Sequence, residues 1–530
     1  MTKRILLMIT ALSLCLGSAL PARQTPPAPA TEDQNTLNLS LDECILKALK
    51  NNLDLAVQVM TPELSDLAVS LAKEKYYPTL SFGYTDQSTA NASYSFLDSQ
   101  GTTNQTQGNY SARLNQSIPL GGVITASLTA YNLTSNANFQ TINPRYGSTL
   151  TFGFSQPLLK NFGPKIADYA ILVAKNNREI SDLQFNQYVQ NKIYEVEQDY
   201  WNLVYAIENL KVQQQSLTLA RDLLEKNQRS VEIGTMAPLD VLNAQAEVAA
   251  READILGGEA LVKNSEDILR TVMNLAAEVQ GASSVPIVPT SQPNNEAQDV
   301  SLEASLKSAM DNRPDLAASK VDIQTSEFNL TYAKNQLLPD LSFNAQYWSP
   351  GVSGTQLIYQ DNDPLTGIVV GQIPGGASNS FNDTFNFKYK NWSVGLILSV
   401  PISNVFSRAS QAQARVNLNQ SIMSLKSREQ QLFLELTNAV RTVQTNYKRV
   451  QAYKVSRELA QKRLEAEVEK LKVGKSTNYL VVQAQRDLAT QMGLELKSII
   501  DYTLSLAGLE TAEGLALKNR KIEISNWLKK

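Results

Sequence analysis

The side chains able to do chemistry in this chain are few and of limited kinds. Its 530 residues include no histidine, which excludes catalysis by histidine, Ser-His-Asp triads and histidine-ligated zinc. Of the two cysteines, Cys15 lies in an N-terminal leader, so Cys44 has no partner for an internal disulfide. No glycine-rich phosphate loop follows a predicted strand. These features argue against an enzyme, a metal site or a cofactor.

Closely spaced carboxylates are the remaining candidates for catalysis. Glu195 and Glu197 form one such pair, and Glu252 and Asp254 form another. Both pairs fall in long runs of helical periodicity, where charged residues normally make up the solvent-facing side. We therefore expect both pairs on solvated helix faces. Trp201, in the first of these runs, is interpreted as an anchor for helix packing.

The elements that hold these residues are very long helices. From residue 166 to residue 233 apolar positions recur at steps of three and four, a coiled-coil period, and the run contains no proline. The segment 234–238 (GTMAP) interrupts the pattern, and a second helix then returns. At about 1.5 Å per residue the outgoing helix is a rod on the order of 100 Å long. A rod of that length must pack against others like it.

The chain contains this unit twice. The segment SLDECILKALKNN (40–52) is similar to SLEASLKSAMDNR (301–313). The similarity continues without a gap to the proline that ends each helix. The later turn and return helix also repeat. The matched pairs include Asn51 with Asn312, Asp54 with Asp315, Pro78 with Pro339, Gly234 with Gly474, and Gln245 with Gln485. Matches that include the helix breakers indicate two tandem repeats.

The repeats and their flanks predict a domain organisation. It comprises a signal peptide (1–22), a Pro-rich linker (23–38), a first repeat (39–280), a second linker (281–300), a second repeat (301–512) and a peripheral C-terminal tail (513–530). Within the first repeat we expect strands at about 79–157 and a helical hairpin at about 165–278. Within the second we expect strands at about 340–401 and a hairpin at about 405–510.

Period-two alternation marks the strands, and prolines mark their ends. Pro78, Pro157, Pro339 and Pro401 stand where strand and helix patterns meet, as expected because proline interrupts both hydrogen-bond ladders. The nine residues from Trp392 to Val400 suffice to cross a bilayer as a tilted strand. We expect a bulge near Lys390 and Asn391, and polar loops at 88–108 and 349–382. Residues 110–118 and 123–131 could form an extra barrel hairpin or a hairpin folded over a loop.

Composition and the N-terminus indicate an exported protein. Lys3 and Arg4 precede an apolar run and small residues, which is typical of a signal peptide cleaved after Ala19 or Ala22. Past this leader, no stretch approaches the length of an apolar transmembrane helix. The net charge of -3, which becomes about -5 without the leader, argues against a nucleic-acid partner.

The order of these motifs resembles the outer membrane efflux proteins, the TolC-like family. The resemblance rests on the paired N-terminal helices, on the strand ends SQPLL (155–159) and SVPIS (399–403), and on the turns at 231–248 and 471–488. It implies a homotrimeric β-barrel in the outer membrane of a Gram-negative bacterium, continued through the periplasm by an α-helical coiled-coil barrel. Its expected role is the passive exit duct of a tripartite efflux pump or type I secretion system. The expected partners are outer-membrane lipid, a periplasmic adaptor and an inner-membrane pump.

The same resemblance assigns the two glycine turns to the gate and the adaptor contact. The residues concerned are Gly234, Thr235, Met236, Ala237, Pro238 and Asp240 in the first turn, and Gly474, Lys475, Ser476, Thr477 and Asn478 in the second. Some relatives narrow the gate with acidic residues, but Leu480 and Gln483 occupy those positions here. We hypothesise that an Asp240–Lys475 pair holds the tip closed, so that charge reversal at Lys475 makes the resting channel leakier.

The number of predicted strands also indicates an oligomeric barrel, independently of the resemblance. One chain offers four to six barrel strands, whereas the smallest natural barrels need about eight, and sheet edges cannot be left open in lipid. Copies must therefore associate, and three copies of four strands give twelve, the first count expected to leave a lumen. The alternative is a periplasmic coiled-coil adaptor or scaffold, which would have no amphipathic spanning strands.

Overall fold

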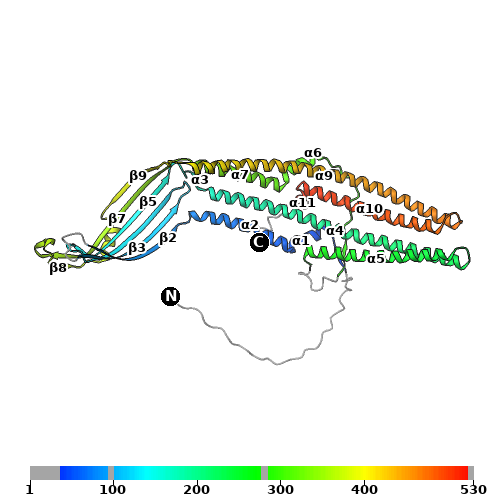
Figure 1. The fold of residues 1–530 in the computed structure, drawn as a ribbon, viewed down its shortest axis with the longest axis horizontal. Helices are drawn as coiled ribbons and strands as arrows, with labels where there is room; N and C mark the ends of the chain where they lie inside the picture. Colours follow the sequence, from blue (N-terminus) through cyan, green and yellow to red (C-terminus); the bar gives the residue numbers. More distant parts are fainter. Residues whose placement is uncertain (1–35, 93–100, 276–284, 523–530) are drawn as a thin grey trace, which may run out of the picture.

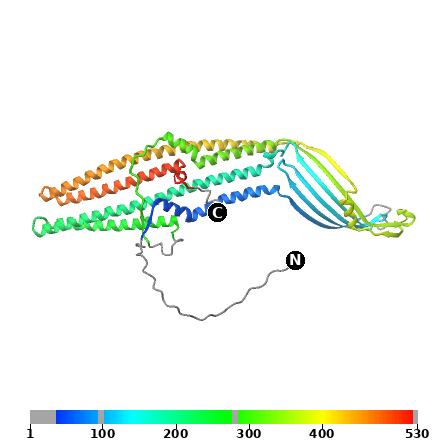
Figure 2. The ribbon, with the colours of Figure 1, turned by 180° about the vertical axis from the view of Figure 1, so that it is seen from behind.

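The computed structural model describes residues 36–92, 101–275 and 285–522, so the predicted signal peptide and most of the first linker lie outside the described residues. The chain forms one elongated body (Figure 1), with a large sheet at one end and paired long helices at the other. The view from behind (Figure 2) shows the same two-part arrangement.

The first repeat contains a short strand, short helices, four long strands and a long helical hairpin. Its elements are β1 (Leu37–Leu39), α1 (Leu41–Asn51), α2 (Leu53–Lys73), η1 (Glu74–Tyr76), β2 (Thr79–Ala92), β3 (Thr102–Ser117), β4 (Val123–Ser135), β5 (Ile142–Pro157), α3 (Pro164–Ala167), α4 (Tyr169–Glu232) and α5 (Pro238–Met273). A side-chain capping box of Ser40 and Glu43 starts α1, and the Asn52 side chain caps α2.

The second repeat follows the same order with fewer long strands. Its elements are β6 (Ile287–Pro289), α6 (Leu302–Asn312), α7 (Pro314–Asn335), β7 (Asp340–Tyr359), η4 (Gln360–Asn362), η5 (Pro364–Thr366), β8 (Val369–Ile373), α8 (Ala377–Phe385), β9 (Asn391–Ser399), α9 (Val405–Lys472), α10 (Asn478–Ala512) and α11 (Ala516–Asn519). Strands β1 and β6 pair in parallel, which joins the segment before the first repeat's first helix to the linker between the repeats.

The large sheet is antiparallel and open at both edges. Its long strands run in the order β2-β3-β4-β5-β7-β9, and the short β8 pairs with the far end of β7. Within the described residues β2 and β9 each pair on one side only. The helices nearest the sheet are layered in the order α2-α4-α7-α9. Each edge strand is therefore connected to an edge helix: α2 leads into β2, and β9 leads into α9.

The pairing register gives the sheet one apolar face and one polar face, because residues directly opposite in register share a face. The face we call the apolar face carries Leu80, Phe82, Tyr84, Tyr110, Leu114, Leu128, Leu150, Phe152, Phe154, Leu341, Phe343, Tyr347, Trp392, Val394, Leu396 and Leu398. The opposite face is mainly polar and carries Ser81, Arg113, Asn115, Thr125, Ser127, Thr149, Thr151, Ser342, Asn344 and Gln346, with Tyr131, Trp348 and Ile397 among them. The apolar side chains lie in the half of the sheet nearest the helices.

The helical part has three apolar cores along its length. One surrounds Ile193 and Tyr200 of α4 and includes residues of α1, a second lies under α9 and α10 around Leu436, and a third lies near the hairpin tips around Val481. Trp201 is buried and meets the Tyr200 ring edge-on, in agreement with its predicted packing role. In the part of the chain that the structure describes, no helix has both the length and the apolar character to cross a membrane.

Three local predictions about the sheet are wrong. Residues 88–92 and 102–108 belong to β2 and β3 rather than to a polar loop, and residues 349–359 continue β7. No bulge lies at Lys390 and Asn391, since α8 ends at Phe385 and β9 starts at Asn391 without a register shift against β7. The segment between them turns at Phe387, which has a positive φ.

The open question of residues 110–131 is also answered. These residues form parts of β3 and β4, which lie in the middle of the sheet between β2 and β5 rather than folded over a loop. The chain therefore contributes six long strands, at the upper end of the predicted range.

Candidate functional site at the tips of the helical hairpins

The two glycine turns have the same backbone geometry and lie at the end of the molecule farthest from the sheet (Figure 1). Gly234 and Gly474 adopt φ of +79° and +72°, and an added Cβ would meet nothing within 4 Å at either one. Glycine is therefore required by the left-handed backbone that ends each outgoing helix, and not by close packing. The amide of the following residue donates to the helix, from Thr235 to Ser230 and from Lys475 to Lys470, both at 2.8 Å.

The return helices begin differently in the two turns. Pro238 occupies the first helical position of α5, where its missing N–H costs nothing, and Asp240 lies in the first turn. In the second turn, the Thr477 hydroxyl accepts from the Leu480 amide and caps α10. Ser476 donates to Glu467 at 2.6 Å, which ties the turn back to α9.

A backbone carbonyl joins the two tips. The Asp240 carbonyl accepts hydrogen bonds from the Asn478 side chain at 3.2 Å and from the Asn227 side chain at 3.4 Å. Both asparagines are buried, so these bonds are shielded from water. Among the described residues no ion pair joins Asp240 to Lys475 within the chain. The structure thus joins two of the predicted tip residues, Asp240 and Asn478, through a side-chain amide.

A buried bridge that the sequence did not point to lies just above the tips. Glu247 of α5 accepts from Arg251 at 2.7 Å and from Arg486 of α10, so it links the return helices of the two repeats. Its side chain is only 3% exposed. Burial acts to raise the pKa of Glu247, but the hydrogen bonds from Arg486 and Arg251 outweigh it and hold its pKa below the ordinary value. Gln485 adds a bond to the Leu219 carbonyl at 3.2 Å.

The four predicted junction prolines all lie where sheet meets helix. Pro78 and Pro339 immediately precede β2 and β7, Pro157 is the last residue of β5, and Pro401 follows the end of β9. Around them, polar contacts fasten the strands to the helices. Tyr76 donates to Asp168, and Gln116 of β3 donates to the Tyr76 carbonyl at 2.6 Å.

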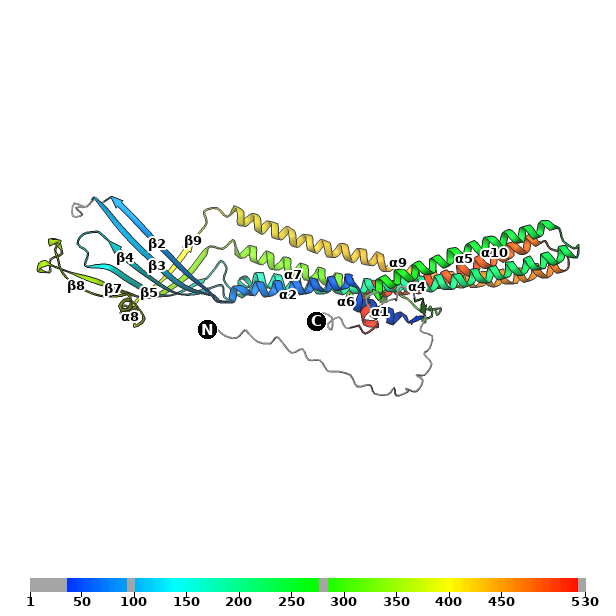
Figure 3. The ribbon, with the colours of Figure 1, turned by 90° about the horizontal axis from the view of Figure 1, so that it is seen from below.

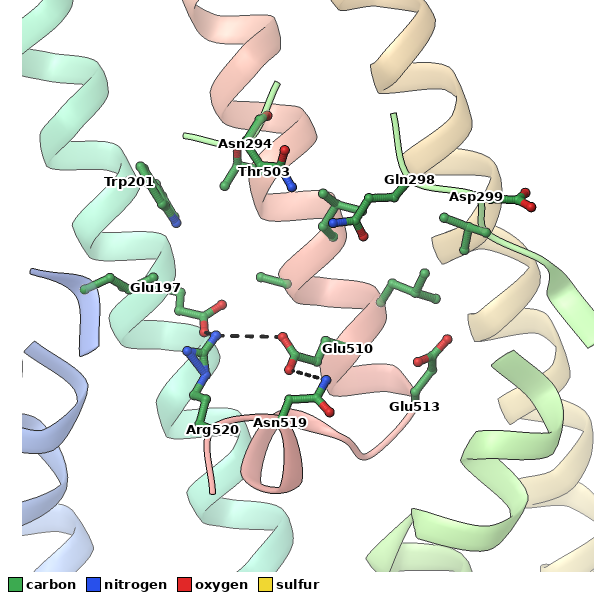
Figure 4. Close-up of a pocket in the computed structure, with 15 residues that line it drawn as sticks. Glu197, Trp201, Asn294, Gln298, Asp299, Thr503, Glu510, Glu513, Asn519 and Arg520 are labelled. Carbon is green, nitrogen blue, oxygen red and sulfur yellow. Dashed lines mark hydrogen bonds and ion pairs between the residues drawn. The ribbon is translucent and has the colours of Figure 1, made fainter. Parts of the chain in front are cut away.

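A second polar cluster lies midway along the helices, where the C-terminal segment docks (Figure 4). Arg520 forms ion pairs with Glu197, with Glu510 at 3.7 Å and with Asp42 at 3.6 Å. Leu517 and Ile522 pack against the core around α4. The prediction of a peripheral tail is therefore wrong for residues 513–522, which connect the C-terminal end of α10 to the middle of α4.

Glu197 is buried, so the expectation that it lies on a solvated helix face is wrong. Its side chain is 3% exposed, whereas Glu195, Glu252 and Asp254 lie on exposed positions as predicted. Burial raises the pKa of Glu197 to about 7, against the opposing attraction of the Arg520 charge. No local pattern indicates this burial, because the partner of Glu197 lies more than 300 positions away in the tail.

The fold is that of solved outer-membrane channels. The chain superimposes on the Campylobacter jejuni CmeC outer membrane channel with a TM-score of 0.61 at 15% identity, covering 91% of this chain and 88% of that one. It superimposes on the open state of the Neisseria gonorrhoeae MtrE outer membrane channel with a TM-score of 0.58 at 17% identity, covering 94% and 98%.

The sequence places the chain within a family of the same kind. The family model for outer membrane efflux proteins matches residues 123–275 and 305–515, so the chain belongs to that family. Over 413 residues it is 24% identical to the outer membrane protein TolC of Vibrio cholerae, covering 76% of this chain and 86% of TolC. The family is one of channels, and the chain is accordingly not an enzyme.

Proposed function

We propose that three copies of this chain form the outer-membrane exit duct of a tripartite efflux pump or a type I secretion system. In this proposal the sheets close into a barrel in the outer membrane of a Gram-negative bacterium, after removal of the signal peptide at residues 1–22. The long helices form a tunnel through the periplasm to an adaptor and an inner-membrane pump. The duct is passive and needs no cofactor.

The proposal depends mainly on one observation: the sheet of a single chain is open, with an unpaired strand at each edge. The sheet is apolar on one face, polar on the other and open at β2 and β9. Backbone groups at an open edge have no partner in lipid, so the edges must pair with other copies. The apolar face then meets lipid, and the hydroxyl-rich and amide-rich face lines a water-filled lumen.

The two edge helices, α2 and α9, each expose a stripe of apolar residues that another helix could cover. On α2 a stripe of exposed apolar residues follows heptad spacing, and each of its members is more than half exposed: Leu53, Val57, Met60, Leu64, Leu67 and Leu71. On α9 a second exposed stripe has the same spacing, with polar Asn419 at one of its positions: Val405, Ala409, Ala412, Val416 and Met423. Stripes of this period are normally buried against another helix. We infer that α2 of one copy packs against α9 of the next.

The six strands and the four helices next to them span similar widths. The same number of copies would therefore close both the barrel and the helical tunnel. Six strands about 4.8 Å apart and tilted by roughly 40° span about 38 Å of a barrel wall. Four helices about 9 Å apart span about 36 Å of a tunnel wall. A sheet of four strands would span only about 25 Å. With six strands, three copies give an eighteen-stranded barrel in place of the twelve strands expected from four.

Within this duct the predicted site residues take defined places. The glycine turns, from Gly234 to Asp240 and from Gly474 to Asn478, form the periplasmic end that closes the resting tunnel and receives the adaptor. The four prolines mark the junction of barrel and tunnel. The Asn478 bond to the Asp240 carbonyl and the Glu247–Arg486 bridge hold the two hairpins of each copy together at that end.

The test is insertion and conduction. Expressed with its leader, the protein should fractionate with the outer membrane, and the purified oligomer should produce discrete conductance steps in planar lipid bilayers. A periplasmic adaptor or scaffold would be released with the periplasm and would give no steps. Recovery of the full-length protein only in the soluble periplasmic fraction would overturn the proposal.

A further inference from the structure

One helix of the second repeat lies on the apolar face of the sheet. Helix α8 packs against β5 and β7 (Figure 3), at Ser148 and Gly351, just beyond the middle of both strands on the side away from the tunnel helices. Its Ser380 and Thr384 are fully buried and each lies 2.7 Å from the hydroxyl of Ser148, which shares a face with Leu150 and Phe152. Residues 377–390, here called the outer strap, therefore cross the face that the proposed barrel turns toward lipid.

The outer strap is built to fit this surface. Ser380 donates to the Gly351 carbonyl at 2.8 Å, and Thr384 donates to the Ser148 carbonyl at 3.1 Å. A Cβ at position 351 would lie 2.0 Å from the Ser380 carbonyl oxygen, so only glycine lets the strap approach β7 this closely. Beyond α8, the Phe387 ring packs against Tyr347 with centroids 5.9 Å apart.

A groove runs between the outer strap and strands β2 to β4. It holds about 470 Å³ and is lined by Phe82, Tyr84, Tyr110, Leu128, Ala130 and Phe381. A second hollow of about 430 Å³ shares Tyr110, Ala130 and Phe381 and extends the groove along the strap. A largely apolar groove on the face that the proposed barrel turns toward lipid has the chemistry to hold a hydrocarbon chain.

Two lysines lie at the C-terminal end of the outer strap, next to the start of β9, whereas the groove lies over β2 to β4 on the other side of β5 and β7. The exposed segment 388–390 places Lys388 and Lys390 on either side of Tyr389, directly before Trp392. Lys388 is paired with Asp383 at 3.0 Å, whereas no ion pair is found for Lys390 among the described residues. A free lysine beside aromatic residues at the outer end of a membrane surface complements a phosphorylated headgroup.

We propose that the groove and the outer strap bind one molecule of lipopolysaccharide per chain, with an acyl chain in the groove and a lipid phosphate near Lys390. The inference rests on the proposed function, because that orientation places this end of the sheet in the outer leaflet. The outer leaflet of a Gram-negative outer membrane is where lipopolysaccharide is found.

The test uses the full-length oligomer extracted from outer membranes in mild detergent, with bound lipid identified by native mass spectrometry. Ala130→Trp fills the groove, and Ala126→Trp places the same side chain on the same strand and face, outside the groove. Wild type and Ala126→Trp should retain one lipopolysaccharide per chain, and Ala130→Trp should lose at least nine-tenths of it. Equal retention by the two variants, or phospholipid in place of lipopolysaccharide, would overturn the inference.

A second variant keeps the test decisive if Ala130→Trp does not fold. Lipid-free protein is titrated with purified lipopolysaccharide or with phosphatidylethanolamine vesicles, and Lys390→Gln should weaken lipopolysaccharide binding several-fold while leaving the oligomer mass unchanged. Unchanged lipopolysaccharide binding by Lys390→Gln would overturn the inference. Absence of the protein from the outer membrane would instead refute the proposed channel, so the two failures are distinguishable.

Discussion

The two repeats have almost identical helices and different sheets. Helices α4 and α9 have 64 and 68 residues, and α5 and α10 have 36 and 35. By contrast, the first repeat contributes four long strands and the second contributes two, with the short β8 and α8 between them. The helix lengths are constrained because both hairpins must end at one tip, where Asn478 meets the Asp240 carbonyl.

The strands are under a different constraint. Inserting β3 and β4 between β2 and β5 keeps every neighbour antiparallel and leaves both edge strands unchanged. A hairpin can therefore be added within the sheet without altering the surfaces that meet the next copy. The difference between the repeats indicates that geometry constrains the edge strands and the tip, whereas the middle of the sheet accommodates an added hairpin.

The largest expected effect comes from the edge helix that the first repeat supplies. Leu64→Glu places an unpaired carboxylate in the proposed contact between α2 and the next copy's α9, where burial without a partner is costly. We expect the trimer to be lost and only lower oligomers to be seen by native mass spectrometry. The control, Gln58→Glu, adds a carboxylate at an exposed position of α2 outside the stripe and should leave the trimer intact. Trimers of normal yield from Leu64→Glu would show that α2 is not an interface.

A smaller effect is expected where the repeats meet at the tip. Glu247→Ala leaves Arg251 and Arg486 without the carboxylate between them, and breaking a buried pair costs on the order of 3–5 kcal/mol, less here because Arg486 is half exposed. We expect the resting conductance in planar bilayers to rise several-fold. Two matched variants should leave it unchanged: Asp487→Ala, which breaks the exposed Arg463 bridge, and Lys475→Glu. A leak caused by Lys475→Glu and not by Glu247→Ala would restore the charge-pair hypothesis, with the pair formed between copies.

The smallest effect concerns the docked C-terminal segment, which only the second repeat has. The pKa of Glu197 is raised to about 7 from an ordinary value of 4.5, so the folded protein favours the protonated acid. This contribution to stability is fully present below about pH 4.5 and is lost as the pH rises toward 7. The melting temperature of the wild type, relative to Glu197→Gln, should therefore fall by a few degrees between these pH values. A difference that does not change with pH in this window would show that Glu197 is ionised throughout.

Periodicity was sufficient to predict the parts of the fold that bury apolar side chains. The helical hairpins, their glycine turns and the alternating strands beside the prolines follow from the spacing of apolar residues and backbone breakers. The outer halves of β2 and β3 were mistaken for a loop because their residues are polar on both faces. There the strands are held by backbone hydrogen bonds between segments such as TDQSTANA and TTNQTQGN, which leave no hydrophobic signal.

The missed contacts share a second cause. Helix α8 docks through Ser380 and Thr384, whose hydroxyl bonds produce no apolar period. The Glu247–Arg486 and Glu197–Arg520 pairs join residues more than 200 positions apart, and in one sequence each looks like an ordinary surface charge. Only the fold reveals which charges are buried.

Cross-linking of the sheet edges tests the central claim most directly. In a Cys44→Ser background, one cysteine replaces Phe82 on β2, and a second replaces Val394, Leu396 or Leu398 on β9. Within one chain these strands are separated by four others, so an intrachain disulfide is out of reach in an open sheet. Oxidation in the membrane should yield a ladder of linked dimers and trimers for at least one pair. Monomers closed by an intrachain bridge in every pair would mean that the sheet closes on itself, and would contradict the account.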